Sequence, residues 1–220
     1  MGENTIRRSC LITLLMSIMD GPLFDILRNQ EQLGYSVNCY TRNNSGILGI
    51  EIDITSQEMK HPVDVVNDRI EKFLQENFKT FLDDMTDDAF KSFLDSQINL
   101  KTAKEIDIEP DFGRNWKEII RQDYIFDRRE QEAEMFKTLT KSELIEFYQS
   151  EVLSPTARKI SIQIIGNSEI KSDETSNELI EEEDSSLKLQ LVTEKSGIHN
   201  EIIIQDINDF KNKLSIYPIA

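Results

Sequence analysis

The chain has 220 residues, 38% of them hydrophobic, and can bury a packed core as one large domain or two small ones. Its 41 acidic and 25 basic residues give a net charge of −16 at pH 7. Nucleic acids and anionic membrane surfaces require a basic face, so we expect neither as a partner, whereas basic peptides would suit this charge. Only two cysteines occur, which favours a cytoplasmic location over a disulfide-linked secreted one.

The first expected element is an apolar helix. Its buried face repeats at intervals of three and four residues, through Leu11, Leu14, Leu15, Ile18, Leu23, Ile26 and Leu27. Gly21-Pro22 should kink or break this helix into two consecutive pieces, because proline cannot donate the helical hydrogen bond. The apolar run Cys10–Met19 is too short to cross a bilayer, so we predict no membrane span and no targeting segment.

An antiparallel hairpin should follow the helix. Two runs alternate apolar with polar residues: Tyr35, Val37 and Cys39, and then Leu48, Ile50, Ile52 and Ile54. Residues 42–46 between them, Arg-Asn-Asn-Ser-Gly, have a turn composition. We therefore expect two paired strands with one face buried.

Helices account for most of the next segment. We expect a first helix from Pro62 with apolar residues up to Phe81, and a second one capped by Thr86. A third helix should follow Pro110 and carry Trp116, Ile119, Ile120 and Tyr124. A short helix over Glu130–Lys137 and a last one opened by a capping box of Thr140 and Glu143 should complete the segment. Arg158–Gly166 then has isoleucines at alternate positions and is typical of a strand.

The composition changes at Asn167. Residues 167–186 hold eight acidic residues against one lysine and no aromatic residue, which indicates a solvated or disordered loop. Order should return with a strand at Ile202–Ile204 and a helix at Asp206–Leu214, which Asp206 or Asn208 could cap. We therefore divide the chain into a core at 1–166, a mobile acidic loop at 167–197, and a returning strand and helix at 198–220. The element order predicts an α+β fold, an antiparallel or mixed sheet covered by a layer of helices.

No complete catalytic site is visible in the sequence. A zinc-protease helix needs two histidines at close spacing, but only His61 and His199 occur, so we predict no metal site made from this chain alone. The glycine-rich loops that bind nucleotides and the G-x-S-x-G nucleophile elbow do not occur either. Carboxylates are so numerous that no pair stands out as a glycosidase site.

Arg28 and Tyr35 are the candidate site residues. They flank the corner between the first helix and the first strand, in the stretch Leu-Arg-Asn-Gln-Glu-Gln-Leu-Gly-Tyr at 27–35. A guanidinium and a phenol can hold a peptide carbonyl and stabilise its developing oxyanion. A structural alternative stays open, because the helix dipole favours a cation in the last turn and a tyrosine that opens a strand often only packs.

Further segments share a specific order and spacing with residues 27–35. They are Arg42–Gly49, Met85–Phe90, Arg114–Trp116, Tyr124–Arg128 and Lys137–Lys141. Together they resemble the C-terminal domain of the pitrilysin (insulinase) family of zinc metalloendopeptidases, in particular its nardilysin-like and insulin-degrading members. The resemblance covers Arg8–Gly166 and returns near Asp206–Pro218.

The resemblance implies an enzyme of four homologous α+β domains around a closed chamber, with zinc and its H-x-x-E-H helix in the first domain. The last domain would close the chamber and present Arg28 and Tyr35 to peptide substrates, with basic or dibasic peptides preferred. This chain would then be a non-catalytic domain, inactive alone and without a cofactor, while the full-length enzyme holds zinc. Its partners would be peptides and an N-terminal catalytic half in the same or a partner chain; a homodimer is left open.

The resemblance also implies a departure from the family pattern. Family domains have strands before the helix that starts here near Thr5, so the chain should begin inside a domain and leave an open sheet edge. Two other functions stay open: a stand-alone peptide-binding or regulatory module, and a structural scaffold with no peptidase role.

Overall fold

The computed structural model describes residues 2–44, 46–56, 60–104, 107–164, 204 and 206–213. Contacts along the chain divide it into two units, Met1–Ile164 and Ile165–Ala220, and each is described by itself. The acidic loop expected at 167–197 and most of the strand expected at Ile202–Ile204 lie outside the described residues.

The first unit is mainly helical, with one small sheet. Its elements in chain order are β1 (Gly2–Glu3), α1 (Ile6–Leu23), η1 (Phe24–Gln30), β2 (Gly34–Asn44), β3 (Ile47–Ser56), α2 (Val63–Lys72), η2 (Phe73–Phe78), α3 (Lys79–Asp84), α4 (Asp87–Thr102), α5 (Ile108–Arg121), α6 (Arg128–Phe136), α7 (Lys141–Tyr148) and η3 (Gln149–Leu153), where η marks the wider π-helical turns. The α+β class predicted from the sequence is confirmed.

The sheet has three antiparallel strands in the order β1-β3-β2. The predicted hairpin is present, and its register pairs Val37 with Ile54 and Cys39 with Ile52. The apolar residues of both strands pack on the core, as the alternation predicted. β1 pairs only with the first two residues of β3, Ile47 and Leu48. The remaining residues of β3 therefore have a ladder partner on the β2 side alone, among the residues that the structure describes.

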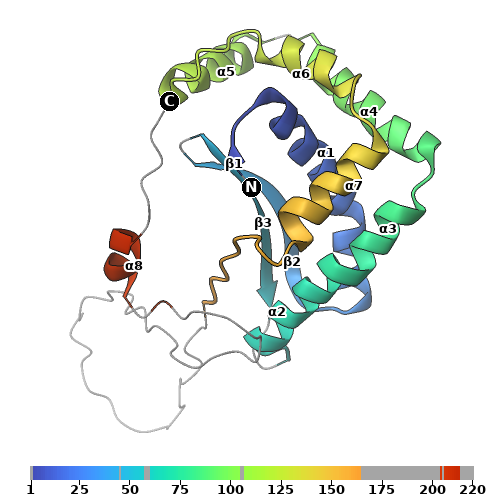
Figure 1. The fold of residues 1–220 in the computed structure, drawn as a ribbon, viewed down its shortest axis with the longest axis vertical. Coiled ribbons are helices and arrows are strands. Elements are labelled where there is room, and N and C mark those ends of the chain that lie inside the picture. The colour runs from blue at the N-terminus through green and yellow to red at the C-terminus, as the bar shows by residue number, and fades with distance from the viewer. Residues whose placement is uncertain are drawn as a thin grey trace, which may run out of the picture. The chain divides into compact units, whose positions relative to one another are not determined.

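Helix α1 is the centre of the core. It contacts β2 and β3 on one side and α4, α6 and α7 on the other, and Figure 1 shows it between the sheet and these outer helices. Nine of its side chains are buried, among them Ile12, Leu15 and Met19, each fully. A helix whose apolar side chains point in several directions is stable where neighbouring elements cover them, which explains its central place.

The predicted break of this helix at Gly21-Pro22 is wrong. α1 continues through Pro22 to Leu23 and passes directly into η1, so the helical segment Ile6–Gln30 is unbroken. Proline removes one helical N–H donor, and the helix widens to π-helical turns just beyond it, over Phe24–Gln30. By length and composition this segment could span a membrane, but 56% of its most apolar window is buried inside the molecule, as in a core helix.

Threonine side chains begin three of the helices. Thr86 Oγ1 accepts the backbone N–H of Ala89 at 3.2 Å, and Thr140 Oγ1 accepts that of Glu143 at 3.3 Å, so both predicted caps are confirmed. Thr5 caps α1 in the same way. The predicted capping box is only half formed, because the Glu143 carboxylate binds the guanidinium of Arg7 at 2.6 and 2.7 Å instead.

The helix expected after Pro110 is α5, which already begins at Ile108 and ends before Tyr124. Its apolar residues face outward, since Trp116 and Ile120 remain 49% and 64% exposed. The strand expected at Arg158–Gly166 is wrong over its described part, because residues 158–164 form no strand and their isoleucines are exposed. Alternating isoleucines suit a strand, but a strand also needs a neighbour for its backbone hydrogen bonds, and the described part of the chain supplies none here.

The second unit is described only around α8 (Ile207–Lys213). This helix lies within the range predicted as Asp206–Leu214. The Asp206 carboxylate accepts the backbone N–H groups of Asn208 and Asp209 at 2.7 and 2.9 Å, so Asp206 is its cap.

Candidate functional site

The corner between η1 and β2 is anchored by two buried leucines. Leu27 is fully buried and Leu33 is 2% exposed, and the backbone N–H of Leu33 donates to the carbonyl of Leu27 at 3.0 Å. Gln32 has a positive φ of 53°, which turns the chain from the helix into the strand. The two buried leucines therefore fix the backbone of the corner, and the polar residues between them lie on its outer side.

Gly34 allows β2 to start close against β3. A Cβ atom at this position would lie 2.2 Å from the carbonyl oxygen of Thr55, so no other residue fits without moving the backbone. The register then shifts between Gly34 and Ser36, which leaves Tyr35 as the extra residue of a β-bulge. A bulge redirects the side chain that it carries. This is why Tyr35 is 85% exposed, although simple alternation would place it with Val37 on the buried face.

The structure brings the two predicted site residues together. Arg28 lies in the last turn of η1, and its Nε donates to the backbone carbonyl of Tyr35 at 3.0 Å. Its guanidinium carbon lies 5.6 Å from the centroid of the Tyr35 ring, within cation–π range. Within the described residues, neither the terminal guanidinium nitrogens of Arg28 nor the Tyr35 hydroxyl has a hydrogen-bond partner. The remaining N–H donors of the guanidinium are therefore free to bind an acceptor from another molecule.

Neighbouring polar side chains support this corner, and the sequence did not single them out. Asp25 accepts hydrogen bonds from Asn29 and Gln30 at 3.2 and 2.8 Å. Glu31 lies 3.7 Å from the guanidinium of Arg69 on α2, which ties the corner to the next helix. The contacts of Asp25 follow from helical spacing. The contact between Glu31 and Arg69 joins residues far apart in the chain, so no local sequence pattern indicates it.

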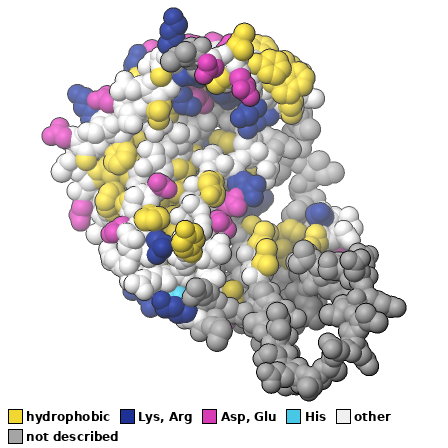
Figure 2. Space-filling model, turned by 180° about the vertical axis from the view of Figure 1, so that it is seen from behind, with side chains coloured by type: hydrophobic (Ala, Val, Ile, Leu, Met, Phe, Trp, Pro, Cys, Tyr) yellow, Lys and Arg dark blue, Asp and Glu magenta, His cyan; other side chains and the backbone are white. Residues whose placement is uncertain are grey.

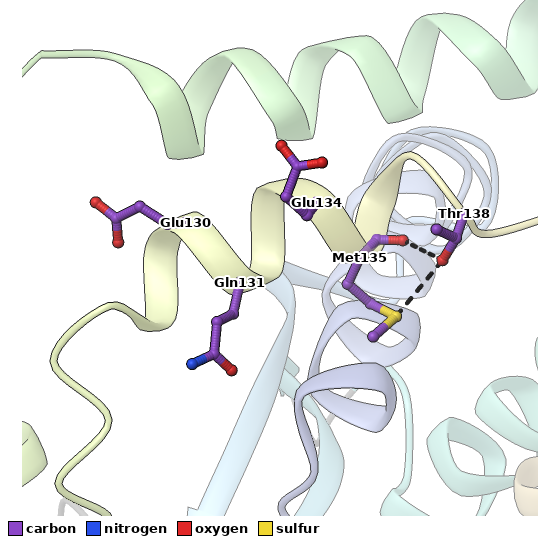
Figure 3. A pocket seen from close by; sticks show the side chains of 5 residues that line it. All are labelled: Glu130, Gln131, Glu134, Met135 and Thr138. Carbon is purple, nitrogen blue, oxygen red and sulfur yellow. Dashed lines mark hydrogen bonds between the residues drawn. The ribbon is translucent and has the colours of Figure 1, made fainter.

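Neither of two surface hollows involves the corner. One of about 470 Å³ lies over α6 and the turn after it, and Figure 3 shows its lining side chains spread outward along the helix. Thr138 donates to the carbonyl of Met135 there, while Glu130 and Glu134 do not converge with Gln131 on a common point. The other, of about 630 Å³, is lined by residues of η1, η2, α3 and α4, including Ile26 and Phe81. Arg28 and Tyr35 line neither of these two hollows, and Tyr35 is 85% exposed.

The described residues do not fit a metal ion. No group of three His, Cys, Asp or Glu side chains that could bind one occurs among them. His61 lies just before α2, and His199 lies outside the described residues. Burial raises the pKa of the Cys10 thiol to about 12 and that of Cys39 to about 11, with the nearby carboxylates of Glu132 and Asp20 acting in the same direction. Both thiols are therefore protonated at neutral pH and are poor nucleophiles and ligands.

Comparison with known proteins identifies the family. The domain family described as "PQQ synthase PqqF-like, C-terminal lobe domain 4" matches residues 14–116. Nardilysin from Rattus norvegicus is 30% identical over 99% of this chain, and nardilysin from Homo sapiens is 31% identical over the same share. The chain belongs to the insulinase family, as a C-terminal domain. The resemblance inferred from the sequence motifs is thereby confirmed.

Other members of the insulinase family agree with this assignment. Insulin-degrading enzyme from Homo sapiens is 30% identical over 95% of the chain. A crystal structure of pitrilysin superposes with a TM-score of 0.61, over 70% of this chain and 16% of its own, at 23% identity, and shows that the fold is of the pitrilysin type. The chain spans only about a fifth of the curated relatives that it matches, 19% of the nardilysins and 20% of the insulin-degrading enzyme.

Proposed function

We propose that this chain is the non-catalytic, peptide-positioning C-terminal domain of a zinc metalloendopeptidase of the nardilysin or insulin-degrading type. The observation that carries the proposal is the arrangement of Arg28. Its Nε holds the Tyr35 carbonyl, and its terminal nitrogens have no hydrogen-bond partner among the described residues and lie beside an exposed phenol. A guanidinium fixed in this way is pre-organised to bind a peptide carbonyl or carboxylate.

Hydrolysis is assigned to another part of the enzyme. The described residues offer no ligand set for zinc, and both thiols are protonated, so this chain has no metal-bound water and no activated cysteine nucleophile there. Zinc bound by a different domain would activate the attacking water. Arg28 and Tyr35 would hold the substrate's backbone while zinc and its water cleave the peptide bond. Tyr35 is exposed, which supports this proposal, because a catalytic half could cover this surface and form a chamber with it.

The substrates that we propose are basic or dibasic peptides. The chain carries a net charge of −16, which attracts cationic peptides and raises their association rate. The net charge raises the rate at which a basic peptide associates but does not fix its bound geometry. The preference for basic peptides should therefore weaken as salt is added.

Equilibrium binding of a labelled dibasic peptide to the purified chain, followed by fluorescence anisotropy, tests the proposal. Replacing Arg28→Ala should weaken binding by about tenfold or more, because a hydrogen bond to a charged donor contributes about 1.5–3 kcal/mol. The matched control is Arg42→Ala at the other end of β2, whose guanidinium pairs with Glu51 instead. It should change the affinity by less than about twofold. Equal binding by the Arg28→Ala variant and the wild type would rule the proposal out.

A further inference from the structure

The net charge of the chain does not say where a basic side chain of a peptide would bind. Among the side chains that Figure 2 draws in colour, acidic and basic ones are interspersed over the face shown rather than separated into two regions. Long-range attraction by a charge of −16 raises the association rate but selects no single residue of a peptide. A specific preference needs a carboxylate that has no partner of its own and lies within reach of the Arg28–Tyr35 corner.

The outer face of the β2–β3 hairpin begins at this corner and carries such a carboxylate. The isoleucines on either side of Asp53 pack on the core, so Asp53 points to the opposite face of the sheet, where it is exposed. The register places Asp53 opposite Asn38, which is three residues beyond Tyr35 on β2. At about 3.3 Å per strand residue, Asp53 is therefore level with a point about 10 Å along the strand from Tyr35.

β3 carries two carboxylates on this face, and only one of them is neutralised within the described part of the chain. Glu51 pairs with Arg42 of β2. Asp53 has no hydrogen-bond or ion-pair partner among the residues that the structure describes, since the amide of Asn38 opposite it donates to Ser36 Oγ at 2.7 Å instead. A carboxylate only accepts hydrogen bonds, so Asp53 can bind a cationic donor from another molecule.

The neighbours of Asp53 on this face suit a long basic side chain. Tyr40 is 49% exposed and lies opposite Glu51, which makes it the diagonal neighbour of Asp53 across the hairpin. Such neighbours lie about 7–8 Å apart. The stem of a lysine or arginine can therefore lie on the tyrosine ring while its charge meets the carboxylate. Nearer the corner the face carries the small side chains of Ser36 and Thr55, which leave room for a peptide main chain.

We propose that Asp53 is a specificity-determining residue that binds one basic side chain of the peptide, with Tyr40 beside it. This inference rests on the proposed function, because Arg28 would hold the peptide backbone about 10 Å away. An extended peptide along the hairpin rises about 3.3 Å per residue, so the lysine or arginine that binds Asp53 lies about three residues from the carbonyl that Arg28 holds. Successive side chains of an extended peptide point to opposite sides, so only one residue of a basic pair reaches Asp53.

Anisotropy titrations with the purified chain measure this contact as a coupling between protein and peptide. The probe is a labelled peptide with a Lys-Lys pair, and each lysine is replaced in turn by norleucine, which keeps the apolar stem without the charge. In the wild type, one replacement should weaken binding about threefold more than the other, the value of an exposed ion pair. In Asp53→Asn, the affinities of the two singly replaced peptides should differ by less than about 1.5-fold, because the contact that separates them is gone.

Asp95→Asn is the matched control. Asp95 is an exposed aspartate on α4, and α1 lies between the sheet and that helix, as Figure 1 shows. The substitution is chemically identical to Asp53→Asn and changes the net charge by the same amount. It should keep the threefold difference between the two peptides. Loss of this difference in Asp95→Asn would show that long-range attraction, not contact with Asp53, sets the preference, and would refute the proposal.

A charge reversal tests the sign of the interaction. Asp53→Lys should bind a peptide with glutamate at the sensitive position more tightly than the Lys-Lys peptide, which reverses the order of the wild type. Circular dichroism shows whether each variant keeps its secondary structure. An unchanged order in a folded Asp53→Lys variant would refute the contact, as would a wild type that does not distinguish the two norleucine peptides.

Arg28→Ala separates this inference from the proposed function. It should weaken the binding of all the peptides by the same factor, because Arg28 is proposed to hold the backbone rather than a basic side chain. If Arg28→Ala weakens binding and Asp53→Asn leaves the difference between the peptides unchanged, the inference fails and the proposed function stands. If Arg28→Ala has no effect, the proposed function fails, and the coupling at Asp53 alone decides whether this residue binds a basic side chain.

Discussion

Arg28 Nε donates to the backbone carbonyl of Tyr35 at 3.0 Å, while the guanidinium carbon lies 5.6 Å from the centroid of the Tyr35 ring. The two residues are seven positions apart, on opposite sides of the corner between η1 and β2. Each limits the movement of the other, because the hydrogen bond fixes the arginine stem and the ring contact fixes the tyrosine side chain. A peptide that binds here meets donors whose conformational freedom is already reduced.

Tyr35→Phe removes the exposed hydroxyl and keeps the ring. We expect peptide affinity to fall by about fivefold, the value of one ordinary hydrogen bond of about 1 kcal/mol. The free energy of unfolding should not change, because the Tyr35 hydroxyl has no partner within the described residues. Anisotropy titration and urea denaturation on the same preparation separate the two effects; a loss of stability that accompanies the loss of binding would indicate a structural role for Tyr35 instead.

Gly34→Ala should destabilise the hairpin and displace the corner. The added Cβ atom would lie 2.2 Å from the Thr55 carbonyl oxygen, and this backbone atom cannot rotate away. We expect a loss of about 1–3 kcal/mol in the free energy of unfolding, measured by urea denaturation. Gly49→Ala on β3 is the matched control, because a Cβ atom added there would meet nothing within 4 Å. Equal behaviour of the two variants would contradict the close approach at Gly34.

Arg128→Met should be among the most destabilising single changes in the chain. It leaves Glu118, which is 3% exposed, as a buried carboxylate that keeps the backbone N–H of Ile125 as a donor but loses its guanidinium partner, at a cost of about 3–5 kcal/mol in the free energy of unfolding. Lys137→Met is the control, because its partner Glu134 is exposed and a surface pair contributes only about 0–1 kcal/mol. Denaturation midpoints compare the two; a small effect at Arg128 would show that Glu118 finds water or another partner.

Alkaline pH should weaken the fold through its buried thiols. Burial raises the pKa of Cys10 from 9.0 to about 12 and that of Cys39 from 9.0 to about 11. A raised pKa in the folded state means that the contribution to stability is complete below pH 9 and is lost progressively above it, until the pH has passed the folded values of about 11 and about 12. Burial raises the pKa of the Tyr148 phenol as well, with the same sign.

Urea denaturation at about pH 8 and about pH 10.5, on either side of the ordinary thiol pKa, measures this loss. Cys10→Ala should reduce the difference between the two midpoints, because it removes one of the groups that ionise on unfolding. At the lower pH the thiols of the folded chain should react with a disulfide reagent much more slowly than those of the chain in urea. Fast reaction in the folded state would show that these thiols are accessible.

The sequence predicted most of the fold because its local signals agree with the tertiary structure. Threonine caps at Thr86 and Thr140 and the alternating residues of the hairpin depend on neighbours close in the chain. The helix through Pro22 was predicted wrongly, because burial of the nine apolar side chains of α1 outweighs the loss of one backbone hydrogen bond. Residues 158–164 show the reverse case, in which the pattern suits a strand but none of the described residues supplies a neighbouring strand.

The sequence named the two candidate site residues, whose role stays a prediction, but it did not indicate their geometry. Motif and resemblance both indicated Arg28 and Tyr35. Alternation alone placed Tyr35 with the buried residues of β2, whereas the bulge at Gly34 turns it to solvent. The outward face of α5 was missed for a similar reason, because apolar periodicity does not say whether a helix covers its own core or another surface.

The most direct test of the account is to incubate the purified chain with a labelled dibasic peptide and to follow binding by anisotropy and cleavage by mass spectrometry in the same sample. We predict saturable binding that depends on Arg28, with the peptide recovered intact whether or not zinc is supplied. Cleavage of the peptide that a chelator abolishes would contradict the account, because it would place the hydrolytic site within these 220 residues.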